Sequence, residues 1–506
     1  MVFYWLLATG YWLLLLPMKH RPAPDIRAIA REAMLDAGLD PDFPPEAARE
    51  VEADERAAGT AAPGPSVRDL RGLLWSSIDN RESRDLDQIE YAERLAPGGY
   101  RVLVGIADVD AFVRAGSAID HHASRNTVPV YTPAVIFPML PGRLSTDLTS
   151  LLEGEDRLAV VMELAVTAEG DVTSKEVYRA VVRNRAKMDY DSAGAWLEGR
   201  GPAPRPIASV EGLEGQLRLQ DEIARALHEL RVKNGALELD TPEAVPVVEG
   251  DRVVGINVRR HNRAQDIIES LMVAANTSMA EYLQDRDVPS LRRVVRAPER
   301  WPLIVKTAEG FGERLPEEPD PRALAEFMAR RREADPAAYP ELSLSILKML
   351  GPGEYMVEAP GLEQEGHFGL AVHDYTHSTA PNRRYPDLVT QRCLKSAAAG
   401  APAPYAREEL EATAEHCNRM ASAARKVERR LRKVAAAALL SARVGETFDA
   451  VVTGVKDKGT FARILRPPAD GRVVRGEEGL DVGDHIRVRL LSTDPERGFL
   501  DFARAG

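Results

Sequence analysis

The chain contains 506 residues, of which 44% are hydrophobic and 28% are charged, and its formal net charge at pH 7 is −12. This length predicts two or three domains and a large buried core. The two cysteines, Cys393 and Cys417, exclude a disulfide framework and a cysteine-based metal site, and they favour a reducing, cytoplasmic setting.

An acidic chain is not an obvious nucleic-acid-binding protein, but here positive charge is concentrated locally. Three basic clusters occur: Arg259, Arg260, His261 and Arg263; Arg292, Arg293, Arg296 and Arg300; and seven basic residues between Arg419 and Lys433. A solvated helix face explains any single cluster. Three clusters in one acidic chain indicate a polyanionic partner.

Residues 1–17 are apolar and include Trp5 and Trp12. Their apolar run is shorter than the roughly 20 residues of a membrane-spanning helix, and it lacks the basic segment that begins a signal peptide. Met18 is a more natural start. We therefore interpret residues 1–17 as a mis-called start in preference to an apolar membrane anchor, and we expect no stable membrane association.

Two amphipathic patterns, at residues 24–40 and 43–57, predict a small helical domain over residues 18–66. The Gly- and Pro-rich residues 59–65 then form a linker.

Strand and helix patterns are mixed over residues 69–401, and a long helix follows. The predicted strands are residues 73–78, 102–106 and 158–166, and the predicted helices are residues 213–232, 263–285 and 405–443. The last of these helices carries a single apolar stripe, for which packing is the default role.

Three aspartates recur just after the first predicted strand, and they are the first candidates for a chemical site. Asp79 ends that strand, and Asp85 and Asp87 share one face if the segment between them is extended. Three carboxylates held together repel each other unless a cation lies between them. Mg²⁺ is the commonest such cation where phosphate is the substrate.

The aspartates allow two other interpretations. Arg81 and Arg84 could neutralise them in a solvated loop, and this alternative stays open on spacing alone. A calcium EF-hand loop fits worse, because Ile89 and Glu90 fall where that loop needs an oxygen ligand and a glycine.

The last sixty or so residues consist of short strands separated by Gly, Pro and Asp, at residues 448–455, 460–465, 485–491 and 498–502. This pattern predicts a small β-barrel. Phe461 follows Lys458 and Gly459, as a base-stacking aromatic residue beside a basic loop would. Core packing explains Phe461 equally well.

Six ordered blocks resemble the ribonuclease II/ribonuclease R family, which is defined by the RNB domain. They are residues 77–88 with the three aspartates, 106–109, 131–141 with Pro-Met-Leu-Pro, 234–240, 267–276, and 367–388 with Arg383 and Arg384. The terminal barrel resembles the ribosomal-protein-S-one type of OB fold. Six blocks in one order are far more specific than any one of them.

The resemblance implies an α+β fold with a mixed RNB catalytic domain over residues 67–443 and an OB-fold RNA-binding domain over residues 444–506. It implies a processive 3′-to-5′ exoribonuclease that hydrolyses single-stranded RNA to nucleoside 5′-monophosphates with one or two Mg²⁺ ions. The expected partner is single-stranded RNA and not DNA, and we expect a cytoplasmic monomer.

The same resemblance assigns roles to individual residues. The metal ligands are Asp79, Asp85 and Gln88; the catalytic residues are Asp87 and Arg383; and the RNA-binding residues are Tyr131, Tyr190, Leu239, Glu269, Arg384, Glu428 and Phe461. A guanidinium fork suits Arg383, because it can hold two phosphate oxygens while charge develops. The Glu269 carboxylate can accept a hydrogen bond from a ribose 2′-OH and so help to distinguish RNA from DNA. Glu428 is the weaker match.

Three features depart from the family pattern. Gln88 replaces a fourth aspartate; it can ligate through its carbonyl oxygen but carries no charge, which puts a second metal ion in question. Leu239 replaces a base-stacking phenylalanine, so terminal bases are held less firmly or differently. A short helical unit of winged-helix or helix-turn-helix type stands in place of cold-shock domains.

Two further functions stay open. A catalytically impaired RNB protein that binds RNA without degrading it is supported by Gln88 alone, and the retained aspartates and Arg383 argue against it. A metal-dependent phosphatase for small substrates would leave the basic clusters and the terminal barrel unexplained.

Overall fold

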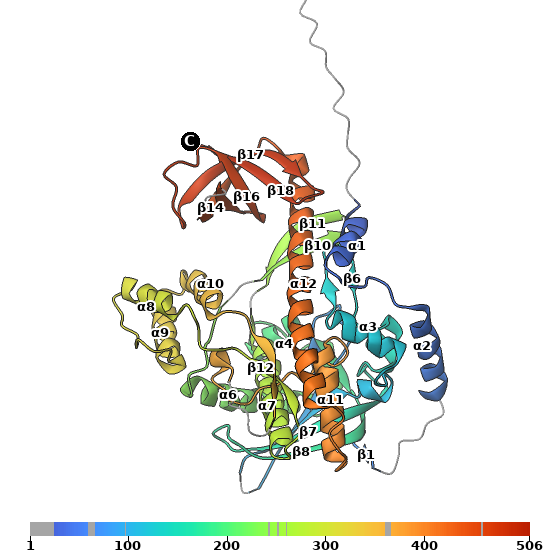
Figure 1. The fold of residues 1–506 in the computed structure, drawn as a ribbon. Helices are drawn as coiled ribbons and strands as arrows, with labels where there is room; N and C mark the ends of the chain where they lie inside the picture. The colour runs from blue at the N-terminus through green and yellow to red at the C-terminus, as the bar shows by residue number, and fades with distance from the viewer. Residues whose placement is uncertain are drawn as a thin grey trace, which may run out of the picture. The chain divides into compact units, whose positions relative to one another are not determined.

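The computed structural model describes residues 25–58, 66–96, 98–240, 243–249, 252–259, 261–359, 366–456 and 459–505. They fall into two compact units: residues 30–432, and residues 433–505 with residues 25–29. Figure 1 shows the elements in chain order. The apolar leader lies outside the described residues. None of the helices described has the length and hydrophobicity needed to cross a bilayer.

A seven-stranded sheet is the centre of the larger unit, with strand order β1-β8-β7-β4-β3-β2-β9. Its strands are β1 (Arg68–Asp69), β2 (Ser76–Asp79), β3 (Gln88–Arg94), β4 (Tyr100–Ala107), β7 (Asp156–Val166), β8 (Val172–Arg183) and β9 (Ala186–Asp189). β1 pairs with β8 and β2 pairs with β9 in parallel, whereas the other neighbours are antiparallel.

Helices cover both faces of this sheet. One face packs against α6 (Leu213–Lys233) and α7 (Arg263–Gln284) through residues such as Val104 and Met162. The other face packs against α3 (Ala118–Asn126), α11 (Tyr385–Ala398) and the first half of α12 (Arg407–Leu440). Because both faces are buried, the central strands β4 and β7 are largely apolar.

The two N-terminal helices, α1 (Ile26–Asp36) and α2 (Pro45–Ala58), confirm the predicted helical region. Ala47 and Val51 of α2 belong to the same core cluster as Trp75 of the sheet. The Glu50 carboxylate accepts the Ala118 and Ile119 backbone N–H groups at 2.8 and 2.9 Å, at the N-terminus of α3. The helix-turn-helix type of this region stays a prediction.

Three helices missed by the sequence patterns, α8 (Trp301–Gly310), α9 (Pro321–Ala334) and α10 (Tyr339–Leu350), share a small core of their own. The remaining α-helices are α4 (Tyr190–Leu197) and α5 (Arg205–Ser209). Three two-stranded pairs complete the strands: β5 (Val130–Tyr131) with β6 (Ile136–Phe137), β10 (Glu243–Glu249) with β11 (Arg252–Arg259), and β12 (Ser290–Val294) with β13 (Glu354–Glu358). Single helical turns lie at Val109–Ala111, Leu144–Leu148, Phe368–Leu370 and Ser441–Arg443.

The smaller unit is a closed barrel with strand order β14-β15-β16-β18-β17, as the sequence predicted. Its strands are β14 (Thr447–Lys456), β15 (Gly459–Leu465), β16 (Pro468–Arg475), β17 (His485–Asp494) and β18 (Phe499–Ala505). Strand β16 escaped prediction because Pro467, Pro468 and Gly471 read as a turn. Ala437 and Leu440, from the end of α12, join the barrel core. The α+β fold class is therefore confirmed.

The contribution of the α2–α3 contact to the free energy of unfolding can be measured. Glu50→Ala removes two charge-assisted hydrogen bonds and a favourable charge at a helix N-terminus, so we expect a loss of about 1–3 kcal/mol in urea-induced unfolding followed by tryptophan fluorescence. Glu46→Ala is the control, because Glu46 lies in the first turn of its own helix, α2, and forms an exposed ion pair with Arg49, which contributes about 0–1 kcal/mol. Equal losses in the two variants would contradict the helix-anchoring role of Glu50.

Candidate active site

The candidate site lies at one edge of the seven-stranded sheet, where β2 and β9 end and β3 begins. The last residues of the parallel strands β2 and β9, Asp79 and Asp189, are paired in register. β3 runs antiparallel to β2, so its first residue, Gln88, returns to the same edge. Tyr190 follows directly as the first residue of α4, whose N-terminus Asp189 caps. The sheet topology thus gathers Asp79, Gln88 and Tyr190.

The loop between β2 and β3 is tied to a neighbouring segment through one hydroxyl group. Ser150 Oγ donates to the Arg84 carbonyl at 2.7 Å and accepts the Leu86 N–H at 2.9 Å. Leu86 is itself buried in the core. The residues just before Gln88 are not part of a strand, but these contacts fix Asp85 and Asp87 on either side of an anchored leucine.

Asp87 and Arg383 form the central ion pair of the site. Asp87 is 2% exposed; its Oδ2 accepts Arg383 Nε at 2.8 Å and its Oδ1 accepts the Asn382 N–H at 3.3 Å. Burial raises the pKa of Asp87 to about 6, although Arg383 opposes the shift. The Arg383 side chain remains 44% exposed, so the rest of its guanidinium group is accessible.

The turn that carries Arg383 is braced by Asp387, which is fully buried. Asp387 accepts the Ala380 N–H at 2.9 Å and the Arg384 guanidinium at 2.8 and 2.6 Å. The Arg383 and Arg384 N–H groups in turn donate to the Ala380 carbonyl at 3.2 and 2.9 Å. Arg384 therefore acts first as a structural group in this turn, and its predicted RNA contact stays a prediction.

Tyr131 and Glu428, predicted separately, are in direct contact. The Tyr131 N–H, on β5, donates to Glu428 Oε1, on α12, at 3.0 Å. The Tyr131 residue is 46% exposed. Burial of the hydroxyl raises the pKa of Tyr131 to about 12, with Asp85, Asp87 and Glu428 adding to the shift and Arg383 opposing it. The Tyr131 hydroxyl is therefore within electrostatic reach of the Asp87–Arg383 pair.

A second group of ionisable side chains consists of Asp79, Glu90 and Tyr190. The half-buried Asp79 accepts the Asn80 N–H at 2.7 Å, and burial raises the pKa of its carboxyl. Burial, together with Asp79 and Glu90, raises the pKa of Tyr190. Glu90 lies on β3 and is fully buried; burial and the neighbouring Asp79 carboxylate raise its pKa well above the usual value. Asp79, Glu90 and Tyr190 thus share one desolvated environment.

These oxygens suit a hard divalent cation that the substrate helps to hold. Within the described residues, no three His, Cys, Asp or Glu side chains are close enough to enclose an ion by themselves. Mg²⁺ is usually bound through one or two carboxylates with waters and substrate phosphates, so a complete protein cage is not required. Asp79, Asp85 and Gln88 offer oxygen ligands at the sheet edge. Both carboxylate oxygens of Glu90 lack a hydrogen-bond partner among the described residues.

Three other predicted RNA-binding residues are described by their own elements. Leu239 packs against the core of α8, α9 and α10. Glu269, on α7, has a side chain that is 51% exposed, with its Oε2 3.9 Å from His261 Nε2. Phe461 lies on β15 in the barrel unit, where Thr460 and Ala462 point inward and Phe461 alternates with them. The core-packing interpretation of Phe461 is therefore not supported.

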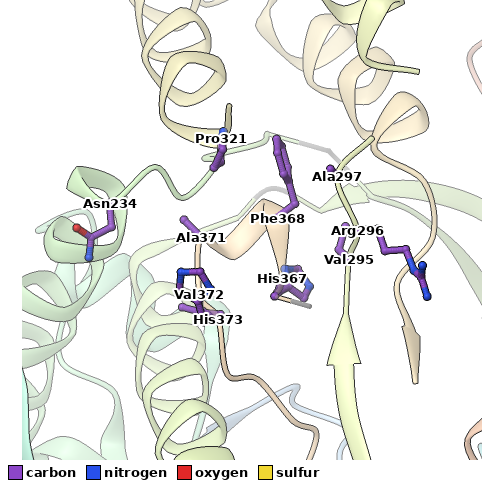
Figure 2. Close-up of a pocket in the computed structure, with 11 residues that line it drawn as sticks. Asn234, Val295, Arg296, Ala297, Pro321, His367, Phe368, Ala371, Val372 and His373 are labelled. Atoms are coloured by element: carbon purple, nitrogen blue, oxygen red, sulfur yellow. The ribbon is translucent and has the colours of Figure 1, made fainter. Parts of the chain in front are cut away.

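A pocket of about 510 Å³ opens elsewhere in the larger unit, and none of the predicted site residues lines it. Figure 2 shows Asn234 and Pro321 on one side, Val295 to Ala297 on the other, and His367 and Phe368 between them. Burial lowers the pKa of His367 to about 4, so this imidazole is neutral near pH 7. The pocket borders the loop that leads to Arg383 but is not the carboxylate site.

Sequence analysis assigned no role to two residues of the site, Asp387 and Glu90. The signal for Asp387 was its spacing of three from Arg384, in the first turn of a helix, where a negative charge is favourable. The signal for Glu90 was an acid between Ile89 and Tyr91, in the buried part of a strand. Neither signal is specific without the tertiary partners.

Two family models match this chain. Residues 67–400 match the model of the RNB domain, and residues 446–505 match that of the RNase II-type exonuclease C-terminal S1 domain. Ribonuclease R of Aquifex aeolicus is 30% identical over 467 residues, which cover 86% of this chain and 64% of the Aquifex protein. The chain thus spans less than two thirds of that relative's length.

Solved structures share the fold. Apo RNase R of Mycoplasma genitalium superposes with a TM-score of 0.82 at 24% identity, over 95% of this chain and 78% of that protein. Yeast Ssd1, described as a pseudonuclease, superposes with a TM-score of 0.65 at 17% identity, over 90% of this chain and 56% of Ssd1. The RNB match covers well over half of the chain and contains the whole Asp87–Arg383 site, and on this basis the chain belongs to the RNB family.

Proposed function

We propose that the protein is a processive 3′-to-5′ exoribonuclease that hydrolyses single-stranded RNA to nucleoside 5′-monophosphates with Mg²⁺. The observation that carries this proposal is the buried Asp87 carboxylate paired with a partly accessible Arg383 guanidinium, beside Asp79 and Asp85. Ribonucleases R named among the relatives support the activity, and the Mycoplasma protein has been solved with ribose-methylated single-stranded RNA and with double-stranded RNA.

Arg383 is suited to hold the scissile phosphate. Its Nε is engaged by Asp87, which fixes the plane of the guanidinium and directs its remaining N–H groups toward accessible space. These N–H groups can donate to phosphate oxygens as charge develops there. The Asp387 brace keeps the turn rigid, so little reorganisation is needed when substrate binds.

Asp87 combines two tasks. It orients Arg383, and its carboxylate, with a pKa of about 6, can accept a proton near neutral pH. Asp79, Asp85 and Gln88 would hold Mg²⁺ at the adjoining edge. When bound, this ion lowers the pKa of a water and stabilises charge on the attacking and leaving oxygens.

In this proposal, side chains from several elements recognise the 3′ end of RNA. Tyr131 and Tyr190 offer rings to the last bases, whereas Leu239, which packs into the α8–α10 core, offers no ring. Glu269 has an exposed carboxylate that can accept from a ribose 2′-OH. The barrel contributes a sequence-independent grip through the outward Phe461 and its cross-strand neighbour Arg472.

We also propose that the enzyme acts as a cytoplasmic monomer. Both cysteines, Cys393 and Cys417, are buried free thiols, as a reducing compartment allows.

An RNB protein that binds RNA without cleaving it is the alternative. The fold alone does not decide, because a pseudonuclease shares it. The intact Asp87–Arg383 pair favours catalysis, since an ion pair that is buried on one side has a desolvation cost that a binding surface would not require.

Asp87→Asn tests the catalytic assignment. The variant keeps the shape of the side chain but removes its charge, so we expect RNA hydrolysis to fall by at least about a hundredfold, as for loss of one essential acid–base group. RNA affinity should change little, because phosphate and stacking contacts supply it. The measurement is the rate of mononucleotide release together with a filter-binding constant. Near-normal turnover would refute the role of Asp87.

Phe461→Ala tests the barrel. We expect RNA affinity to fall by about five- to a hundredfold, which corresponds to about 1–3 kcal/mol for one base stack, with little change in the single-turnover cleavage rate at saturating enzyme. Phe499→Ala is the control, because Phe499 is an exposed barrel phenylalanine on β18, whereas Phe461 is partly buried on β15. The same loss of affinity in both variants would indicate no specific stacking by Phe461.

Glu269→Gln tests ribose recognition. Loss of a charge-assisted hydrogen bond to the 2′-OH should reduce the preference for an all-ribose 3′ end over a 2′-deoxy 3′ end by about ten- to a hundredfold. Glu281→Gln serves as the control on the same helix, because Glu281 pairs with Lys175 at the surface. The assay compares kcat/KM for the two substrates. An unchanged preference would show that Glu269 does not read the sugar.

A further inference from the structure

Glu90 has a buried carboxylate that forms no hydrogen bond within the described part of the chain. It is fully buried in the middle of β3, and neither of its carboxylate oxygens has a hydrogen-bond partner in the described part of the chain. A buried ionisable group without partners costs several kcal/mol. A buried polar group without a hydrogen-bond partner therefore needs an explanation, such as a catalytic role or a bound ion.

The position of Glu90 connects it to the active-site edge. Residues two apart on a strand share a face, so Glu90 lies on the same side of β3 as Gln88. Its partner across to β2 is Ser76, and β2 leads from there to Asp79 at the sheet edge. Asp79 is the charged group that acts on Glu90, and both act on Tyr190. Glu90 is therefore an acidic neighbour of the proposed metal ligands.

A purely structural role for Glu90 lacks the expected contacts. Ser76 Oγ, directly opposite in register, is also buried without a hydrogen-bond partner among the residues described. Gln220 Nε2 donates to the Glu90 backbone carbonyl at 3.4 Å and to Gln216 Oε1 at 3.5 Å, but it does not donate to the Glu90 carboxylate, and Gln220 Oε1 has no partner among the described residues. The carboxylate is thus not an anchor for these polar neighbours. Two carboxylates in one desolvated environment repel each other, and a cation between them removes that repulsion.

We propose that Glu90 is a metal-ligating residue, which with Asp79 and the Gln88 carbonyl oxygen holds one divalent cation at the active-site edge. The inference rests on the proposed function, because this cation would be one that hydrolysis uses. Gln88 then supplies a neutral oxygen and Glu90 supplies the charge. Two carboxylates and one amide oxygen leave positions for water and substrate phosphate, as is usual for Mg²⁺.

The test is binding of Mn²⁺ alone, as a paramagnetic probe, to the full-length protein without RNA. Electron paramagnetic resonance counts free Mn²⁺ during a titration, and Mg²⁺ competition follows. We expect Glu90→Gln to lose one Mn²⁺ equivalent or to bind it at least about tenfold more weakly. The double variant Gln88→Asp with Glu90→Gln moves the carboxylate two residues along the same face and should recover binding. Glu169→Gln, an exposed loop acid, should bind as the wild type does.

Folding is monitored by thermal unfolding in EDTA, where Glu90→Gln should be at least as stable as the wild type because an unpaired buried charge is removed. Equal Mn²⁺ binding by Glu90→Gln and the wild type would overturn the inference, and so would the absence of saturable binding by the wild type. RNA hydrolysis by the wild type is measured in parallel. Hydrolysis with unchanged Mn²⁺ binding refutes only the role of Glu90, whereas no hydrolysis refutes the proposed function.

Discussion

The ion pair between Asp87 and Arg383 is the interaction on which the candidate site depends. It joins two segments that are 296 residues apart in the sequence. A carboxylate as buried as Asp87 would be strongly destabilising without a cationic partner. The pair therefore fixes the start of β3 against the turn before α11, and each segment is also anchored independently, by Ser150 and by Asp387.

Sheet topology explains why the other acids lie near this pair. Parallel pairing of β2 with β9 and antiparallel pairing of β2 with β3 place Asp79, Gln88 and Tyr190 at one edge. The acids then differ in environment: Asp87 is paired with an arginine, whereas Glu90 has a carboxylate neighbour and no hydrogen-bond partner among the described residues. Such differences separate the roles of chemically similar groups.

Much of this fold was accessible from the sequence. Hydrophobic periodicity located the long helix α12, the helices α6 and α7, and the strands β4 and β7 within a few residues. The barrel was predicted from its short strands, but β16 was not, because its prolines and glycine read as a turn. Helices α8, α9 and α10 were missed because their apolar residues face a small separate core.

The site was predictable only in part, and for a physical reason. Motifs named Asp79, Asp87 and Arg383, but no local pattern says that Asp87 is buried against Arg383. The contact of the Tyr131 backbone with Glu428 and the brace formed by Asp387 depend on residues from distant segments meeting in space. Glu90 shows the limit most clearly, since its missing partners are a property of the packed sheet.

The proposed function requires that nucleotides are removed one at a time from the 3′ end of RNA. The most direct measurement compares two copies of one single-stranded RNA, labelled at the 5′ or the 3′ end, with Mg²⁺ and with EDTA. We expect immediate release of a labelled nucleoside 5′-monophosphate from the 3′-labelled RNA, accumulation of a short end product from the 5′-labelled RNA, and neither in EDTA. Intact RNA that remains bound in Mg²⁺, or internal fragments from both labels, would contradict the proposed function.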